Sequence, residues 1–188
     1  MKNGCFQLSV ATSEGQFIAR YSEKGLAGLE FPPVGRAPAA PTCRAVASWR
    51  RRELQSGGRS PRAVRTNDIP AKVSNWHRAT ESALHNILAG RDAAELPPLD
   101  PAGTAFQQSV WRELRRIPLG QTRSYGEIAK RIGNPKAVRA VGGACGANPI
   151  PVLVPCHRVL AANKKIGGFS GGLDRKRALL ARESVALR

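Results

Sequence analysis

The stretch Ile150-Pro151-Val152-Leu153-Val154-Pro155-Cys156-His157-Arg158 places a nucleophile directly after an apolar run. A short, uninterrupted apolar run predicts a buried strand or extended segment rather than a helix. The cysteine at its end presents a thiol at the rim of the core, and a thiol attacks only as thiolate. Successive side chains on a strand point to opposite faces, so Cys156 and His157 can cooperate only if the backbone turns or a water bridges them. The alternative is a structural cysteine beside a hydrogen-bonded histidine.

Upstream of this stretch, the sequence predicts two short helices joined by Gly133-Asn134-Pro135. Ser124-Tyr125-Gly126-Glu127 has the pattern of a capping box and opens a helix that ends near Ile132, before the glycine. Asn134 and Pro135 suit the N-cap and the first position of a second helix, from about 135 to 145. Two helices connected in this way predict a helix-turn-helix.

The second of these helices has two different faces. Val138, Val141 and Cys145 share the face expected to be buried, so Cys145 is predicted to be an inert core thiol. The other face has little bulk and carries basic groups, which suits close approach to nucleic acid phosphates. Tight packing against another helix is the alternative explanation. The residues of this face are Lys136, Ala140, Gly143 and Ala147, and Arg139 lies beside it.

This order of motifs resembles the O6-alkylguanine-DNA alkyltransferases, also called methylated-DNA–protein-cysteine methyltransferases. The chain reproduces their Pro-Cys-His-Arg-Val core at residues 155–159. The likeness covers roughly residues 104 to 187. Its further motifs are Ser124-Tyr125, Gly133-Asn134-Pro135, Ala137–Gly142, Ala147-Asn148-Pro149, Ser170-Gly171-Gly172 and Leu179–Glu183.

The resemblance implies direct-reversal DNA repair. An alkyl group, such as methyl, would pass from O6 of guanine to Cys156 irreversibly and once per protein, with O4 of thymine left open as a second substrate. A relay would run from Glu183 through His157 and a water to the thiol. Tyr125 would help to neutralise the leaving guanine at N3, and Asn148 would brace the turn before the active-site segment. No cofactor is implied, because the cysteine is itself the acceptor.

The resemblance also assigns the DNA contacts. The second helix would enter the minor groove of double-stranded DNA, where Arg139 replaces a flipped-out nucleotide. Ser124 is expected to contact the DNA together with the small, basic face described above. A glycine-rich loop at 167–172 would lie over the guanine, and its Phe169 stands where many family members have tyrosine. The expected base contacts are Tyr125, Val154, Phe169 and Ser170, with Pro155 and Arg158 bracing the site.

The final helix is predicted to start near Asp174 as N-cap and to carry Glu183 on its apolar face. Leu179, Leu180 and Glu183 lie within one helical turn. A carboxylate on such a face needs a partner. An exposed glutamate at the end of the helix is the alternative, but the resemblance favours a hydrogen bond to His157.

The N-terminal half completes an expected α+β fold of two domains. Three strands, at 6–10, 16–21 and 26–31, predict a small antiparallel sheet, and an apolar stripe predicts a helix at 72–89. The proline-rich run at 96–101 separates residues 1–99 from a mainly helical domain, 100–188, that holds the helix-turn-helix. Residues 32–66 open with four prolines and contain eight arginines, which indicates a linker or mobile insertion, either a solvated charge run or a contact to DNA phosphates.

Charge and cysteine usage narrow the class of protein. The 188 residues carry a net charge of +17, and residues 100–188 hold 16 Lys and Arg against 5 Asp and Glu. Such basicity favours nucleic acid as partner, then a membrane surface. No apolar run has transmembrane length, and four widely spaced cysteines indicate reduced thiols. We therefore expect a soluble monomer in the cytoplasm, or in the nucleus of a eukaryote. Zinc is not expected, because Cys5, Cys43, His77 and His85 lack ligand spacing.

Two other classes remain open at this point. A DNA-binding module could recognise alkyl lesions without transferring the alkyl group, and Cys156 argues against it. A cysteine hydrolase would use the same nucleophile, and the charge and the predicted helix-turn-helix argue against that class.

Overall fold

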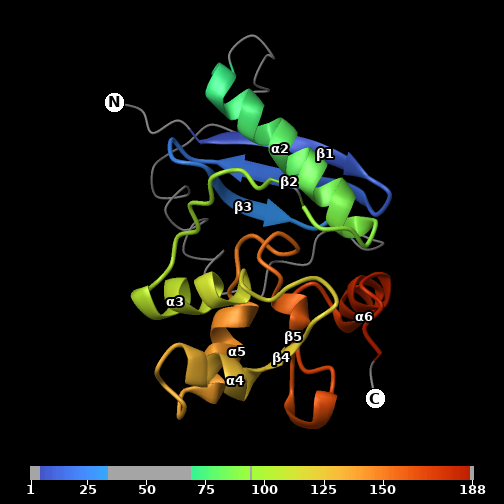
Figure 1. The fold of residues 1–188 in the computed structure, drawn as a ribbon. Coiled ribbons are helices and arrows are strands. Elements are labelled where there is room, and N and C mark those ends of the chain that lie inside the picture. The colour runs from blue at the N-terminus through green and yellow to red at the C-terminus, as the bar shows by residue number, and fades with distance from the viewer. Residues whose placement is uncertain (1–4, 34–68, 94, 187–188) are drawn as a thin grey trace.

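The computed structural model describes residues 5–33, 69–93 and 95–186. Within them the fold is α+β, as predicted: a small antiparallel sheet with one helix, followed by a mainly helical part (Figure 1). Most of the predicted insertion at 32–66, with its arginines, lies outside the described residues.

The sheet is a three-stranded meander with one buried face. Its strands β1 (Phe6–Thr12), β2 (Gly15–Tyr21) and β3 (Leu26–Glu30) pair antiparallel in that order. Alternation along β2 buries Phe17, Ala19 and Tyr21. Helix α2 (Ala71–Leu88) lies across this face (Figure 1) and covers it with an apolar stripe that includes Val73, Ala83, Leu84, Ile87 and Leu88.

The outer edge of β3 connects the sheet to the rest of the molecule. The backbone N–H of Leu26 donates to Pro98 O at 2.8 Å, and that of Asp100 donates back to Leu26 O at 2.8 Å. The N–H of Leu29 donates to Pro149 O, also at 2.8 Å. Because Pro149 lies just before the segment that carries Cys156, the sheet is bonded directly to the chain around the predicted nucleophile.

Four helices and a pair of very short strands build the second part. Strands β4 (Arg123–Ser124) and β5 (Val159–Leu160) pair in parallel. Thr104 and Gln107 form a capping box at the start of the first helix, and Ser124 and Glu127 form the predicted one at the start of the second. The helices are α3 (Ala105–Leu114), α4 (Tyr125–Arg131), α5 (Val138–Gly146) and α6 (Leu173–Arg182).

Two predicted N-caps, Asn134 and Asp174, are wrong. Helix α5 begins at Val138, with Ala137 as N-cap, because residues 134–137 form a separate turn in which Ala137 N donates to Asn134 O at 3.0 Å. Asn-Pro is a turn signal as well as a helix-start signal, and here the turn prevails. Helix α6 starts one residue before Asp174, after Gly172 at φ 92°. Helices α4 and α5 pack against each other, and their use as a DNA-binding helix-turn-helix remains a prediction.

The apolar run before Cys156 is buried and not helical, as predicted, but it forms a tight turn in place of the predicted strand or extended segment. Pro151 bridges to Val154, and Val152 has a φ of 73°. Pro151 and Pro155 lack the backbone N–H that a sheet ladder needs, which explains why an apolar run fails to form a strand here. Residues Cys156–Arg158 then form a short 3₁₀ helix, η2.

A buried hydrogen bond connects α5 to α3: Trp111 Nε1 donates to Ala144 O at 2.8 Å. We expect Trp111→Phe to lower the free energy of unfolding by about 1–3 kcal/mol, because Ala144 O loses its side-chain donor in a buried position. Urea denaturation measures the change. Trp76→Phe, at a half-buried position in α2, removes the same atoms and should cost less; an equal loss for the two variants would contradict the role assigned to Trp111.

Candidate active site

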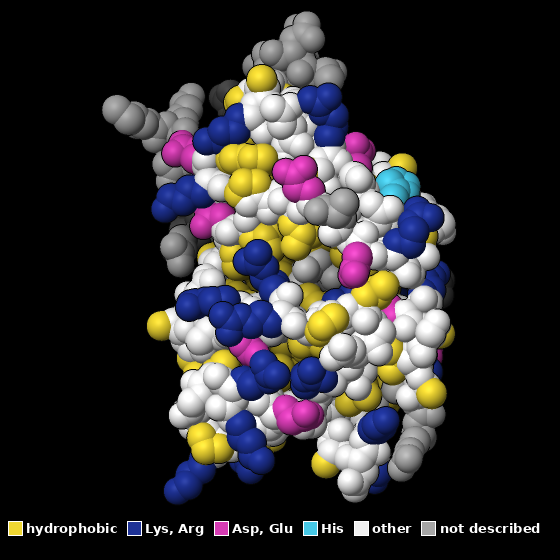
Figure 2. Space-filling view, viewed as in Figure 1, with side chains coloured by type: hydrophobic (Ala, Val, Ile, Leu, Met, Phe, Trp, Pro, Cys, Tyr) yellow, Lys and Arg dark blue, Asp and Glu magenta, His cyan; other side chains and the backbone are white. Residues whose placement is uncertain are grey.

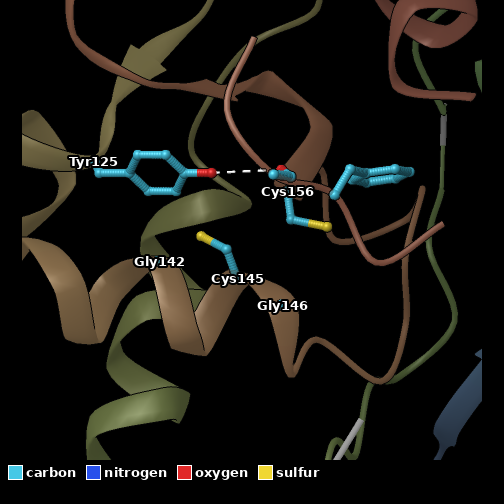
Figure 3. Close-up of a pocket in the computed structure, with 7 residues that line it drawn as sticks. Tyr125, Gly142, Cys145, Gly146 and Cys156 are labelled. Atoms are coloured by element: carbon cyan, nitrogen blue, oxygen red, sulfur yellow. Dashed lines mark hydrogen bonds between the residues drawn. The ribbon is translucent and has the colours of Figure 1, made fainter. Parts of the chain in front are cut away.

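A cavity of about 60 Å³ lies beside Cys156 (Figure 3). Its wall combines the start of α4, one side of α5, the first residue of η2 and the glycine-rich loop before α6. Both Cys145 and Cys156 contribute to it. The lining residues are Tyr125, Gly142, Cys145, Gly146, Cys156, Gly168 and Phe169.

The 3₁₀ helix η2 presents three consecutive functional side chains to the interior. Cys156, His157 and Arg158 are 3%, 0% and 6% exposed. In a 3₁₀ helix successive side chains are separated by about a third of a turn, unlike the opposite faces of a strand. The backbone turn that cooperation between Cys156 and His157 requires is therefore present.

Glu183, at the end of α6, is held by both neighbours of the cysteine motif. Its Oε1 lies 2.8 Å from His157 Nε2, which is the predicted hydrogen bond. Arg158 Nε donates to Oε2 at 2.9 Å, and Arg158 Nη2 donates to Oε1 at 3.0 Å. Burial alone would raise the pKa of Glu183, but the hydrogen bonds from His157 and Arg158 outweigh burial and lower it. The carboxyl group is therefore ionised and held in place by His157 and Arg158.

The carboxylate fixes the tautomer of His157. An ionised carboxylate only accepts hydrogen bonds, so Nε2 must carry the proton. Burial lowers the pKa of His157 despite the opposing effect of Glu183, which keeps the ring neutral. The lone pair then sits on Nδ1, which is buried and has no hydrogen-bond partner among the residues that the structure describes. His157 is thus arranged as a base at Nδ1.

The thiol of Cys156 is protonated at rest. Burial raises its pKa, against a hydrogen bond from Asn148 and the nearby charge of Lys176. Asn148 Nδ2 donates to Cys156 Sγ at 3.1 Å and to Val154 O at 2.8 Å. Asn148 Oδ1 accepts from Ile150 N at 3.0 Å. This amide therefore contacts the sulfur and also ties together the turn between α5 and η2.

Lys176 is a buried cation that sequence reasoning missed. Its side chain is fully buried, and its Nζ donates to Val159 O at 2.6 Å and to Gly168 O at 3.2 Å. Burial lowers its pKa to about 8. A signal was available, because Lys176, Leu180 and Glu183 fall on one face of the last helix. Lys176 holds the glycine-rich loop against β5 and brings positive charge toward the thiol.

Tyr125 remains a hydrogen-bond donor throughout the physiological pH range. Burial, with the nearby thiols Cys145 and Cys156, raises its pKa to about 12. Its Oη donates to Gly168 O at 3.5 Å across the cavity (Figure 3). A base entering the cavity would meet this hydroxyl.

The other predicted base contacts are not all brought together. Phe169 lines the cavity, but Ser170 is exposed on the loop and Val154 is buried behind the site; neither lines the cavity. Pro155 precedes η2 as its N-cap. Cys145 is a buried core thiol, as predicted: it is 6% exposed, and burial raises its pKa to about 12. It also lines the cavity, which the sequence pattern did not indicate.

The predicted DNA-contacting face of α5 is open to solvent. Arg139, Ala140 and Gly143 are exposed, and no heavy atom beyond the helix would lie within 4 Å of a Cβ at Gly143. Packing against another described element therefore does not explain the small residues. Val138, predicted to be buried, is 41% exposed, because it begins the helix and lies beyond the packed core. Lys136 is exposed in the preceding turn, whereas the Ser124 hydroxyl is engaged in its capping box.

Basic side chains are distributed over the face of the molecule that Figure 2 shows. Among the described residues, no group of three or more His, Cys, Asp or Glu is placed to hold a metal ion. Within the residues that the structure describes, no helix is long and apolar enough to cross a membrane.

A buried thiol beside a neutral histidine that a carboxylate orients defines a protein with a cysteine nucleophile. The family profile described as "6-O-methylguanine DNA methyltransferase, DNA binding domain" matches residues 105–185. A methylated-DNA–protein-cysteine methyltransferase of Methanosarcina acetivorans is 58% identical over 120 residues, 64% of this chain and 77% of that protein. One of Haemophilus influenzae is 57% identical over 88 residues, which are 47% of this chain and 49% of that protein.

Solved structures extend the similarity over nearly the whole chain. The crystal structure of Mycobacterium tuberculosis OGT in complex with DNA has a TM-score of 0.64 and 34% identity, covering 95% of this chain and 92% of that one. That of the M. tuberculosis O6-methylguanine methyltransferase has a TM-score of 0.65 and 33% identity, covering 97% and 95%. The chain belongs to the methylated-DNA–protein-cysteine methyltransferase family.

The Glu183–His157 contact gives the first test of the site. We expect Glu183→Gln to slow alkylation of Cys156 by about 10²- to 10⁴-fold, the usual size of a general-base contribution, because an amide no longer fixes the proton on Nε2. The rate of transfer from O6-methylguanine DNA, followed as methyl bound to protein, measures it. The substitution should also destabilise the fold, by about 3–5 kcal/mol, because Arg158 loses its buried counter-charge.

Glu113→Gln is the matched control. Glu113 is 5% exposed and pairs with Arg116 and Arg131, away from the cavity. It should lower stability and leave the rate per folded molecule unchanged. An equal loss of rate in both variants would remove Glu183 from the chemistry.

Proposed function

We propose that this protein repairs DNA by direct reversal, transferring an alkyl group from O6 of guanine to Cys156. The observation that carries the proposal is the hydrogen bond between Glu183 and His157, because His157 directly follows Cys156, whose side chain lines the cavity. Three relatives that are 58%, 59% and 61% identical to the aligned part of the chain are named methylated-DNA–protein-cysteine methyltransferase, which supports the same reaction. The partner is double-stranded DNA, and the protein acts as a monomer wherever its DNA lies, in the cytoplasm or a nucleus.

The reaction begins with extrusion of the damaged base. Helix α5 meets the minor groove with its small face, and Lys136 holds phosphate. Arg139 enters the stack in place of the flipped nucleotide, which offsets part of the unstacking cost of a few kcal/mol. Exposure of Arg139, Ala140 and Gly143 supports this assignment.

The chemical step is a displacement at the alkyl carbon. His157 Nδ1 takes the thiol proton through a bridging water, and the sulfur of Cys156 forms the new S–C bond while the C–O6 bond breaks. The electron pair of that bond leaves with the guanine, and the Tyr125 hydroxyl donates toward N3 as negative charge develops. Glu183 stabilises the imidazolium that forms. The reaction needs no cofactor, because Cys156 itself accepts the alkyl group.

The product keeps the alkyl group. A thioether has no electrophilic carbonyl for water to attack, and its leaving group would be a thiolate. Each protein molecule therefore acts once. O4-alkylthymine presents the same alkyl–oxygen bond and is the second substrate to test.

A stoichiometric burst tests the reaction. Incubation with excess O6-methylguanine duplex should transfer one methyl group per protein and then stop, and Cys156→Ala should transfer none. The methylated cysteine has to be identified within one peptide, because Cys145 also lines the cavity and trypsin leaves both thiols on the peptide Ala140–Arg158. Fragmentation of that peptide should place the methyl group on Cys156, and Cys145→Ala should keep the burst. Many methyl groups per protein, or methyl on Cys145, would overturn the mechanism.

Arg139 separates base flipping from chemistry. We expect Arg139→Ala to slow transfer from duplex DNA much more than transfer from free O6-methylguanine, because a free base needs no extrusion. Rates on the two substrates give the comparison. Lys136→Ala serves as control, since loss of one phosphate contact should weaken DNA binding and reduce its salt dependence without changing the rate on bound DNA. Equal slowing of Arg139→Ala on both substrates would assign Arg139 to folding or chemistry.

A further inference from the structure

The glycine-rich loop at 167–172 forms part of the cavity wall through Gly168 and Phe169. Its backbone is unusual, with Gly167 at φ 64° and Gly172 at φ 92°. Glycine at four of six positions leaves the segment little side-chain packing of its own. Something outside the loop must therefore fix the position of Phe169.

Phe31, the residue that follows β3, packs against this loop from the sheet side. Its ring meets that of Phe169 edge-on, with centroids 5.9 Å apart and an interplanar angle of 70°. The loop backbone also lies directly on Phe31: a Cβ at Gly171 would come within 2.7 Å of the Phe31 ring and 2.8 Å of the Phe169 ring. Gly171 is therefore needed for this close approach.

Phe31 is itself fixed from two further directions. Its ring lies 5.5 Å from that of Phe17, which is fully buried in the sheet core. The guanidinium of Arg175, on α6, lies 4.8 Å from the Phe31 ring centroid and also hydrogen-bonds Pro32 O. Contacts of this kind stabilise one ring orientation. The chain of contacts runs from the sheet core through Phe31 to Phe169 and the cavity.

We propose that Phe31 is a positioning residue for the alkylated base, through which the N-terminal sheet sets the place of Phe169 in the cavity wall. This inference rests on the proposed function. Phe31 does not line the cavity, so it acts through Phe169 and not by touching the base. The N-terminal half thereby contributes to substrate binding although the nucleophile and the DNA-contacting face lie in the other half.

The test compares Phe31→Ala with Phe31→Tyr and with Phe6→Ala. Phe6, in β1, is a half-buried phenylalanine of the same sheet, so its truncation removes the same atoms. The rate of Cys156 methylation by free O6-methylguanine is measured over a range of base concentrations. Iodoacetamide alkylation of Cys156 is followed against pH in parallel, and deuterium exchange reports on the amides of residues 167–172.

We expect Phe31→Ala to raise the half-saturating base concentration about tenfold, the order expected for loss of an aromatic contact. The maximal rate and the iodoacetamide pH profile should stay at wild-type values, and the loop amides should exchange faster. Phe31→Tyr should restore the wild-type base affinity and loop exchange, and Phe6→Ala should leave both at wild-type values. If Phe31→Ala does not fold, Arg175→Gln, which releases one side of the Phe31 ring, should give a smaller shift in the same direction.

Three outcomes would overturn the inference: unchanged base affinity and loop exchange in Phe31→Ala, the same shift in Phe6→Ala, or parallel loss of base and iodoacetamide reactivity. Failure of the proposed function looks different, because the wild-type protein would then not accept methyl from the base at all, while the exchange measurement would still report whether Phe31 holds the loop.

Discussion

The buried carboxylate of Glu183 is the interaction on which the rest of the site depends. It comes from the last helix and binds His157 and Arg158, which follow the nucleophile directly. A buried carboxylate is stable only when its charge is paired and its oxygens are hydrogen-bonded, and here Arg158 supplies the charge. Arg158 also donates to Ile117 O at 2.7 Å, so the same network reaches the end of the helical segment around α3. Three parts of the chain that are distant in sequence are thereby fixed around one thiol.

The sheet has a comparable role on the other side. The outer edge of β3 bonds to Pro149 and to residues 98–100, and Phe31 continues from the same strand to the loop over the cavity. An open edge strand favours aggregation, and here the N–H groups of Leu26 and Leu29 are bonded to Pro98 and to Pro149, the latter in the segment that leads to Cys156. The similarity to solved structures likewise extends over nearly the whole chain, although the chemical motifs lie in its second half.

Much of the fold could be predicted because the decisive signals are local. Capping residues predicted the start of α4, and alternation predicted the meander. The spacing of Leu179, Leu180 and Glu183 placed the carboxylate on the apolar face, but the hydrogen bond to His157 was predicted only with the help of the family resemblance. The errors arose where local signals compete. Asn134-Pro135 codes for a turn or a helix start, and the apolar run before Cys156 contains prolines that a strand does not tolerate.

Contacts between distant segments were out of reach of these signals. The cavity position of Cys145 depends on how α5 is rotated against η2, and the Phe31–Phe169 contact joins residues more than a hundred positions apart. Lys176 lies between these cases: its place on the apolar face could be derived from spacing, but its two carbonyl partners could not.

Burial of the Cys156 thiol has a consequence for the life of the molecule in a cell. Its pKa is raised, and Cys156 is 3% exposed. A cell contains many soft electrophiles, such as quinones and unsaturated aldehydes, that consume exposed thiolates. A reagent that can be used only once would be exhausted by them if its sulfur were permanently ionised and open. Under the proposed function, a sulfur that is buried and protonated at rest reacts little with such electrophiles, so the number of active protein molecules is set by the amount of DNA damage and not by the background chemistry of the cell.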